Sequence, residues 1–359
     1  MPAVTREQVE GALRDVVDPF LETDLVSSRS VKDIEVADGK VTVRVLLGYP
    51  AKSHFDALAD LVKARVAALP GVSSVAVEVT SKVVSHAVQK GVQPMKDVKN
   101  IIAVASGKGG VGKSTVAVNL ALALSQEGAR VGILDADIYG PSQPRMLGMH
   151  QKPESKDGKS LEPIVSYQVQ SMSIGYLIDE ETPMIWRGPM VTQALEQLLK
   201  DTHWRDLDYL IIDLPPGTGD IQLTLAQKIP VSGAVIVTTP QDIATLDAKK
   251  ALKMFEKVEV PVLGIVENMA VHTCSNCGHV EHLFGQGGGE RMAAQYGVPL
   301  LGSLPLDIAI REQGDAGQPV VVAAPDSAVA QAYRQTARVM AATLAQRPRA
   351  SVPIASSLV

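Results

Sequence analysis

The sequence contains almost no cysteine. Cys274 and Cys277 are its only two cysteines in 359 residues, so a framework of disulfide bonds is excluded. It also lacks an apolar run as long as a membrane span, and Met1–Glu10 has no apolar core of a signal peptide. These absences predict a cytoplasmic protein without membrane contact, in which a close pair of cysteines indicates metal or redox chemistry.

An excess of basic residues is missing as well. The formal net charge is −5 and the isoelectric point lies near 5.8, which argues against a protein held on nucleic acid by phosphate contacts. Hydrophobic residues make up 46% and charged residues 20%, which is typical of a globular chain and not of a disordered one. The length allows two domains with a large core.

Residues 1–80 have the pattern of a small α+β domain. Thr5 and Gln8 have the spacing of a capping box, and Asp38-Gly39 is typical of a hairpin turn. The expected order is a helix after Thr5, strands at Val31–Val36 and Lys40–Leu46, a helix at Ser53–Leu69 and a strand at Val72–Val79. This order resembles the small domain of iron–sulfur assembly factors. Their usual Asp-Pro-Glu is Asp18-Pro19-Phe20 here, which favours a docking or regulatory module.

Residues 81–99 are polar and contain Pro94, and we expect them to form a linker. From residue 100 to residue 345, apolar runs alternate with helical patterns, which predicts an α/β fold with a mostly parallel sheet covered by helices. The expected strands are Ile101–Ala105, Val131–Leu134, Gln168–Ile174, Tyr209–Ile212, Gly233–Thr238, Val262–Glu267 and Leu300–Ser303. The expected helices are Val116–Ser125, Met190–Lys200, Ile221–Gln227, Thr245–Lys257, Glu290–Tyr296 and Ala328–Leu344. Residues 346–359 are expected to be a flexible tail without a basic amphipathic membrane helix.

A glycine-rich loop between the first of these strands and the first of these helices is the most informative stretch. It fits the pattern G-x-x-x-x-G-K-[ST] in the strand–loop–helix context that a phosphate loop needs. Glycines let backbone N–H groups turn toward a phosphate, the helix N-terminus adds partial positive charge, and Lys113 adds a full charge. The expected nucleotide-binding residues are Gly107, Lys108, Gly109, Gly110, Val111, Gly112, Lys113, Ser114 and Thr115.

Lys108 is a second lysine in this loop. The run Lys108–Thr115 resembles the deviant Walker A motif of the ParA/MinD/nitrogenase-reductase class of ATPases. The resemblance implies that Lys108 reaches across a homodimer to the partner's nucleotide, where a cation stabilises transition-state charge. A solvated loop lysine is the alternative. We therefore expect Lys108 and Lys113 to be catalytic residues of an ATPase.

Two aspartates stand at the ends of expected strands. Asp213 ends an apolar run as in a Walker B motif, and we expect it to bind Mg²⁺ through water, with the Ser114 hydroxyl as a further ligand. By resemblance to the class, Asp137 positions the attacking water and belongs to the Mg²⁺ site. Alternatively, Asp135 and Asp137 cap the following turn. The prolines and glycines of Leu214–Asp220 suit a switch loop.

Three residues are candidates for recognition of the adenine base. Asn268 directly follows an expected strand, and Pro305 and Asp307 come just after the last one. The carboxyl ends of parallel strands are where ligands bind in such folds. The class resemblance supports this role, and ordinary turn roles are the alternative.

Cys274 and Cys277 form a C-x-x-C turn. Thiolates at this spacing face one ion or cluster and suit zinc or iron–sulfur. Two cysteines do not complete a four-ligand cluster, whereas two copies across a two-fold axis supply four. The alternatives are zinc held within one chain together with His279 and His282, and a redox-active cysteine pair.

Several motifs together resemble the Mrp/ApbC family of iron–sulfur cluster carriers over about residues 95–345. They are Lys108–Thr115, Asp135–Ser142, Trp186–Met190, Asp213–Asp220, Glu267–Cys277, Phe284–Gly289 and Pro305–Arg311. The resemblance implies a homodimer that uses ATP and Mg²⁺, carries a [4Fe–4S] cluster on Cys274 and Cys277, and transfers it to apo-proteins. A ParA/MinD-like positioning ATPase with a structural zinc or a redox C-x-x-C is the alternative hypothesis. Nitrogenase-reductase-like electron transfer is a third, but those proteins place single cysteines far apart.

Overall fold

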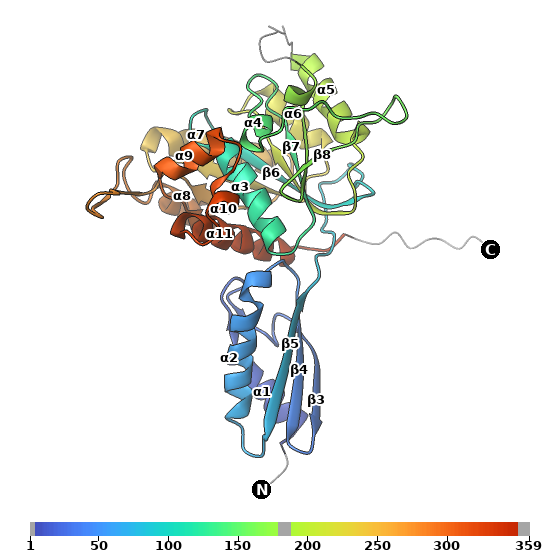
Figure 1. Cartoon of the computed structure of the whole chain (residues 1–359), viewed down its shortest axis with the longest axis vertical. Helices are drawn as coiled ribbons and strands as arrows, with labels where there is room; N and C mark the ends of the chain where they lie inside the picture. Colours follow the sequence, from blue (N-terminus) through green and yellow to red (C-terminus); the bar gives the residue numbers. More distant parts are fainter. Residues whose placement is uncertain (1–3, 179–187, 351–359) are drawn as a thin grey trace, which may run out of the picture.

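The computed structural model describes residues 4–178 and 188–350. Figure 1 shows a small domain, drawn in blue at the bottom, beneath a larger domain that contains the rest of the chain. Trp186 and Arg187 of the expected family motif lie outside the described residues, as do residues 351–359 of the expected tail.

Within residues 4–81, the small domain has a three-stranded sheet with two helices packed on it. β3 pairs antiparallel with β4, and β4 pairs parallel with β5. The capping box that the sequence predicts is present, because the Thr5 side chain accepts from Gln8 N and the Gln8 side chain accepts from Thr5 N. The elements are α1 (Arg6–Leu13), β1 (Val17–Asp18), β2 (Thr23–Asp24), β3 (Val31–Ala37), β4 (Lys40–Leu47), η1 (Lys52–His54), α2 (Phe55–Ala67) and β5 (Ser74–Ser81).

In the described part of the larger domain, eight strands form one sheet in the order β15-β12-β11-β6-β10-β7-β9-β8. Neighbouring strands are parallel, with the exception of β8 and β9. This arrangement confirms the expected fold class. The strands are β6 (Val98–Ser106), β7 (Val131–Asp135), β8 (Ile164–Ser166), β9 (Val169–Ser173), β10 (Leu207–Asp213), β11 (Gly233–Thr238), β12 (Val262–Glu267) and β15 (Leu300–Ser303).

Helices cover both faces of this sheet (Figure 1). Ile102 and Val104 of β6 point into the core formed with α3, α10 and α11, whereas Ile101 and Ala103 point into the core formed with α5, α6, α7 and α8. The helices are α3 (Lys113–Gln126), α4 (Gln143–Met146), η2 (Ile174–Tyr176), α5 (Gly188–Asp201), α6 (Asp220–Lys228), α7 (Asp242–Lys257), α8 (Gly288–Tyr296), α9 (Ile308–Asp315), α10 (Val320–Ala323) and α11 (Ala328–Ala345). Among the residues described, no helix is both long and apolar enough to cross a membrane.

The strand β9 begins later in the structure than the sequence predicts, and the cause is a local turn. Tyr167 and Gln168 have positive φ angles of 49° and 65° and make the turn between β8 and β9, so the expected strand Gln168–Ile174 begins too early. Residues that turn the chain through the left-handed region cannot continue a strand. β8 itself is three residues long, which is too short to give a sequence pattern.

The segment expected to be a linker lies against the larger domain. Val83, His86 and Gln89 are buried, and the Gln89 side chain accepts from Val231 N at 3.1 Å. The beginning of the expected tail is hydrogen-bonded to this segment, because Ala350 N donates to the Ser85 carbonyl oxygen at 3.0 Å. These contacts fix the path of the chain between the two domains.

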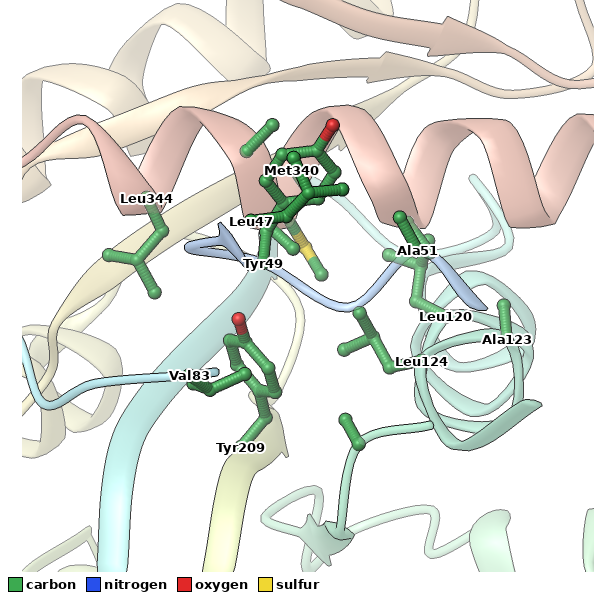
Figure 2. Packing of buried hydrophobic residues seen from close by; sticks show 14 of the residues in the cluster. Leu47, Tyr49, Ala51, Val83, Leu120, Ala123, Leu124, Tyr209, Met340 and Leu344 are labelled. Carbon is green, nitrogen blue, oxygen red and sulfur yellow. The ribbon is translucent and has the colours of Figure 1, made fainter. Parts of the chain in front are cut away.

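The two domains share a continuous hydrophobic core. Figure 2 shows Leu47, Tyr49 and Ala51 of the small domain beside Leu120 and Leu124 of α3, with α11 running across them. These side chains are almost completely buried, so the small domain covers the C-terminal half of α3. Apolar area removed from water is the main stabilising term in such a junction.

A buried ion cluster closes this junction. The Glu127 side chain, directly after α3, accepts from Ser53 N at 2.9 Å, from Ser53 Oγ at 2.6 Å and from Arg338 Nη1 of α11 at 2.9 Å. The Arg338 guanidinium also lies 4.9 Å from the centroid of the Phe20 ring. The Glu127 carboxylate therefore connects the small domain, α3 and α11 at one point.

We predict that Glu127→Ala lowers the free energy of unfolding by about 3–5 kcal/mol, because it leaves the Arg338 charge buried without its partner. Urea unfolding measures the loss, and limited proteolysis of residues 81–99 reports whether the domains separate. Glu256→Ala is the matched control, since Glu256 forms an exposed ion pair with Lys253 and should lose less than about 1 kcal/mol. Equal losses in the two variants would contradict the role of the buried cluster.

Candidate functional site

The loop after β6 has the backbone shape of a phosphate loop. Gly110 and Gly112 have φ angles of 84° and 79°, in the left-handed region that favours glycine. A Cβ on Gly107 would lie 2.1 Å from the backbone of Asp247, and a Cβ on Gly112 would lie 2.3 Å from Asn268 Nδ2. The glycines are thus needed for the backbone conformation and for the close approach of α7 and the loop after β12.

Lys113, the first residue of α3, forms a buried ion pair with Asp213 at the end of β10. Lys113 Nζ also lies 3.2 Å from Ser114 Oγ, and Gln143 Nε2 donates to Asp213 Oδ2 at 2.9 Å. The structure therefore brings together the lysine, the hydroxyl and the carboxylate that the sequence proposes for phosphate and Mg²⁺ binding. Lys108 lies half-buried on the same loop, and its carbonyl oxygen accepts from Ser106 Oγ at 2.9 Å.

Asp135 and Asp137 have different surroundings. Asp135 is fully buried and accepts from the backbone N–H groups of Asp137, Ser142 and Gln143 at 3.0–3.1 Å, so it caps the turn, as one sequence hypothesis proposed. Burial, followed by repulsion from Asp213, raises the pKa of Asp135. Asp137 lines a cavity of about 600 Å³ together with Tyr139 and residues of the loop after β10. Burial raises the pKa of Asp137 and nearby Lys113 opposes the shift.

A second cavity, of about 210 Å³, lies beside Gly112 and Thr115 at the start of α3. Its lining includes Asn268, Pro305 and Asp307, so the structure places the three base-recognition candidates around one space. Two of them also have local roles: Asn268 Nδ2 donates to the Val111 carbonyl oxygen at 2.9 Å, and Asp307 caps α9 by accepting from Ala309 N at 2.8 Å.

Sequence reasoning missed other residues of this cavity. Met146, Ile310, Arg311 and Tyr333 also line it. Met146 ends the four-residue helix α4 and two others lie on the eight-residue helix α9, neither of which was expected. Tyr333 is on the expected helix Ala328–Leu344, whose sequence shows no sign of a neighbouring cavity.

The cysteine pair lies on an exposed hairpin that follows β12 at the carboxyl edge of the sheet. β13 (His272–Thr273) pairs antiparallel with β14 (Val280–Glu281), and Cys274 N donates to the His279 carbonyl oxygen at 2.8 Å. The backbone N–H groups of Cys277 and Asn276 and the Cys277 thiol lower the pKa of Cys274. A lower thiol pKa favours the thiolate that metals and clusters bind.

The two histidines of the zinc alternative, His279 and His282, have local contacts of their own. His282 Nδ1 lies 3.0 Å from the Ala270 carbonyl oxygen, and His279 Nε2 lies 3.7 Å from Glu281. Within residues 4–178 and 188–350, no group of three His, Cys, Asp or Glu side chains is placed to hold a metal ion. The cysteines therefore offer two thiolates per chain and leave other ligands to come from elsewhere.

The base of the hairpin is hydrogen-bonded to the wall of the smaller cavity. Ala270 N donates to the Leu304 carbonyl oxygen at 2.9 Å, and Leu306 N donates to the Val271 carbonyl oxygen at 2.8 Å. Pro305 and Asp307 of the same wall face the cavity. The cysteine hairpin and the cavity are consequently joined through backbone bonds.

The parallel sheet, the loop before α3 and the Lys113–Asp213 pair define a P-loop nucleoside triphosphatase. A protein-family model described as NUBPL iron-transfer P-loop NTPase matches residues 97–341, and one described as iron-sulfur cluster assembly protein matches residues 6–79. The chain belongs to this NUBPL iron-transfer P-loop NTPase family, which confirms the resemblance seen in its motifs.

Two known proteins of similar sequence are named iron-sulfur cluster carrier proteins. The chain is 62% identical over 271 residues to an iron-sulfur cluster carrier protein of Pseudomonas fragi, covering 75% of this chain and 94% of that relative. It is 51% identical over 344 residues to the iron-sulfur cluster carrier protein of Escherichia coli, covering 96% and 93%. A solved nucleotide-binding protein from Archaeoglobus fulgidus, in complex with ADP, is 40% identical with a TM-score of 0.55, covering 62% of this chain and 88% of that one.

We predict that Gly112→Ala lowers the stability of the nucleotide-free protein by about 1–3 kcal/mol, because alanine is strained at this φ and its Cβ would meet Asn268. Urea unfolding measures the loss. Gly109→Ala is the control, since its added Cβ would point into open space. If the two variants were equally stable, the loop conformation described above would be wrong.

Proposed function

We propose that this protein binds and hydrolyses ATP and carries an iron–sulfur cluster of the [4Fe–4S] type at a homodimer interface, for transfer to apo-proteins. The observation that carries the proposal is the exposed cysteine hairpin at the same edge of the sheet as the phosphate loop and joined to the cavity beside it. A cytoplasmic location, where thiols stay reduced, agrees with this role.

The donor set in the phosphate site fits Mg²⁺. Ser114 Oγ and the Asp213 carboxylate are hard oxygen donors that both lie beside Lys113 Nζ. Mg²⁺ typically takes one or two protein oxygens and completes its shell with water and substrate phosphates, and it neutralises charge on those phosphates. No larger cage of carboxylates is needed for such a site.

Each protein group has a definite task in hydrolysis. Lys113 exchanges the Asp213 carboxylate for nucleotide phosphate, and the loop N–H groups hold the phosphate oxygens. Asp213 is then available for a Mg²⁺-bound water. Asp137 accepts a hydrogen bond from the attacking water and orients it, and Lys108 stabilises charge in the partner's site.

The cluster is cargo in this proposal. Cys274 and Cys277 from each of two chains supply the four thiolates that a [4Fe–4S] cluster takes. The exposure of Cys277 allows a second chain to approach it and allows an apo-protein to reach the cluster. The alternative of a positioning ATPase needs a separate role, a structural zinc or a redox function, for the same cysteine pair.

Asp137→Asn is predicted to keep nucleotide affinity and to slow ATP hydrolysis at least about 100-fold, because the amide keeps the size and loses the charge that orients water.

Lys113→Ala is predicted to weaken nucleotide binding by roughly ten- to 100-fold, since a charged hydrogen bond to phosphate is lost. Fluorescent-nucleotide titration and phosphate release separate the two effects. Parallel loss of binding and turnover in Asp137→Asn would assign that residue to the structure of the turn instead.

Anaerobic reconstitution with iron and sulfide tests the cargo. We expect about four iron and four sulfide per dimer, a brown chromophore, and complete loss of both in Cys277→Ala. Ser275→Ala, in the same exposed turn, is the control and should bind the cluster normally. Stoichiometric zinc without iron after anaerobic purification, or a full cluster on a monomer, would reject the bridging arrangement.

A further inference from the structure

Tyr333 forms part of the wall of the smaller cavity, although sequence reasoning assigned it no role in binding a ligand. It lies near the N-terminal end of α11, its side chain is completely buried, and it lines the cavity with Gly112, Thr115 and Asn268. Among the described residues, the Tyr333 hydroxyl has no hydrogen-bond partner.

Such an unpartnered hydroxyl is unfavourable, and two other buried tyrosines of this protein do have partners. The buried hydroxyl of Tyr49 donates to Asp18 at 2.7–2.8 Å, and that of Tyr176 lies 2.8 Å from Ser171 Oγ. Leaving a buried polar group unpaired costs about 1–3 kcal/mol. Burial raises the pKa of Tyr333, so its O–H group stays protonated and available as a donor.

The position of the cavity indicates which part of a nucleotide would meet this hydroxyl. The phosphate-binding groups, Lys113 and the loop N–H groups, lie at the N-terminus of α3. The lining of the cavity includes Gly112 and Thr115 but neither Lys113 nor Asp213, and Pro305, Leu306 and Ile310 give it apolar walls. Apolar walls with a few polar groups are typical of a site for a flat organic ring.

We propose that the Tyr333 hydroxyl hydrogen-bonds to the nucleoside of the bound nucleotide and thereby contributes to its selection. The proposal rests on the proposed nucleotide site, and it adds a specificity residue that the motifs of the chain do not contain. A site that pairs a buried polar group with its ligand discriminates against ligands that leave this group unpaired.

Tyr333→Phe removes one hydroxyl and keeps the ring. We expect its affinity for ATP to fall about three- to tenfold, the size of one neutral hydrogen bond, and its affinity for inorganic tripolyphosphate, which has no nucleoside, to stay unchanged. The nucleotide-free variant should be at least as stable as the parent protein, because no hydrogen bond is lost in that state. Tyr209→Phe, at the opposite edge of the sheet, is the control for loss of a buried tyrosine hydroxyl and should bind ATP normally.

Three results would overturn the proposal. They are unchanged ATP affinity in Tyr333→Phe, an equal loss for ATP and tripolyphosphate, and lower stability of the nucleotide-free variant with an unchanged shift in melting temperature on adding ATP. The last result would show that the hydroxyl serves the fold, for example through a buried water. Failure of the parent protein to bind ATP would instead reject the nucleotide site itself, so the two failures are distinguishable.

Discussion

Helix α3 must be buried on nearly every side, and this requirement determines which elements of the protein pack around it. Residues 116–124 of this helix are all buried, and a helix that is apolar all round requires cover on all sides. The sheet covers one side, α11 a second, and the small domain the C-terminal half (Figure 2). The small domain is therefore part of the packing of the phosphate-loop helix, and Glu127 holds it there.

The Lys113–Asp213 pair explains how the charged Lys113 side chain can be buried in the nucleotide-free protein. A buried ammonium without a partner would be strongly unfavourable, and Asp213 compensates it before any phosphate arrives. A phosphate must then compete with a carboxylate that is already in place. The cavity wall and the base of the cysteine hairpin share backbone hydrogen bonds, which connect the two features physically.

Features that depend on neighbours along the chain were predictable. β11, β12 and β15 begin and end where expected, because each is an apolar run with a proline close to one end. Contacts between residues that are distant in the sequence were not predictable. Arg338 lies 211 positions from Glu127, and no local pattern pairs them. Helical spacing identified α11 without showing that Tyr333 lines a cavity, and the motifs located Asn268 without its bond to Val111.

The small domain and the cysteine hairpin belong to opposite edges of the sheet. The phosphate loop lies at the start of the 14-residue helix α3 and the small domain covers its C-terminal half, so about half of the helix, roughly 10 Å, separates them. Under the proposed function, a recipient bound at the small domain would collect a cluster from the hairpin only if its own body bridged that interval. Hand-over in this proposed role would therefore require a recipient that is long enough to contact both places at once.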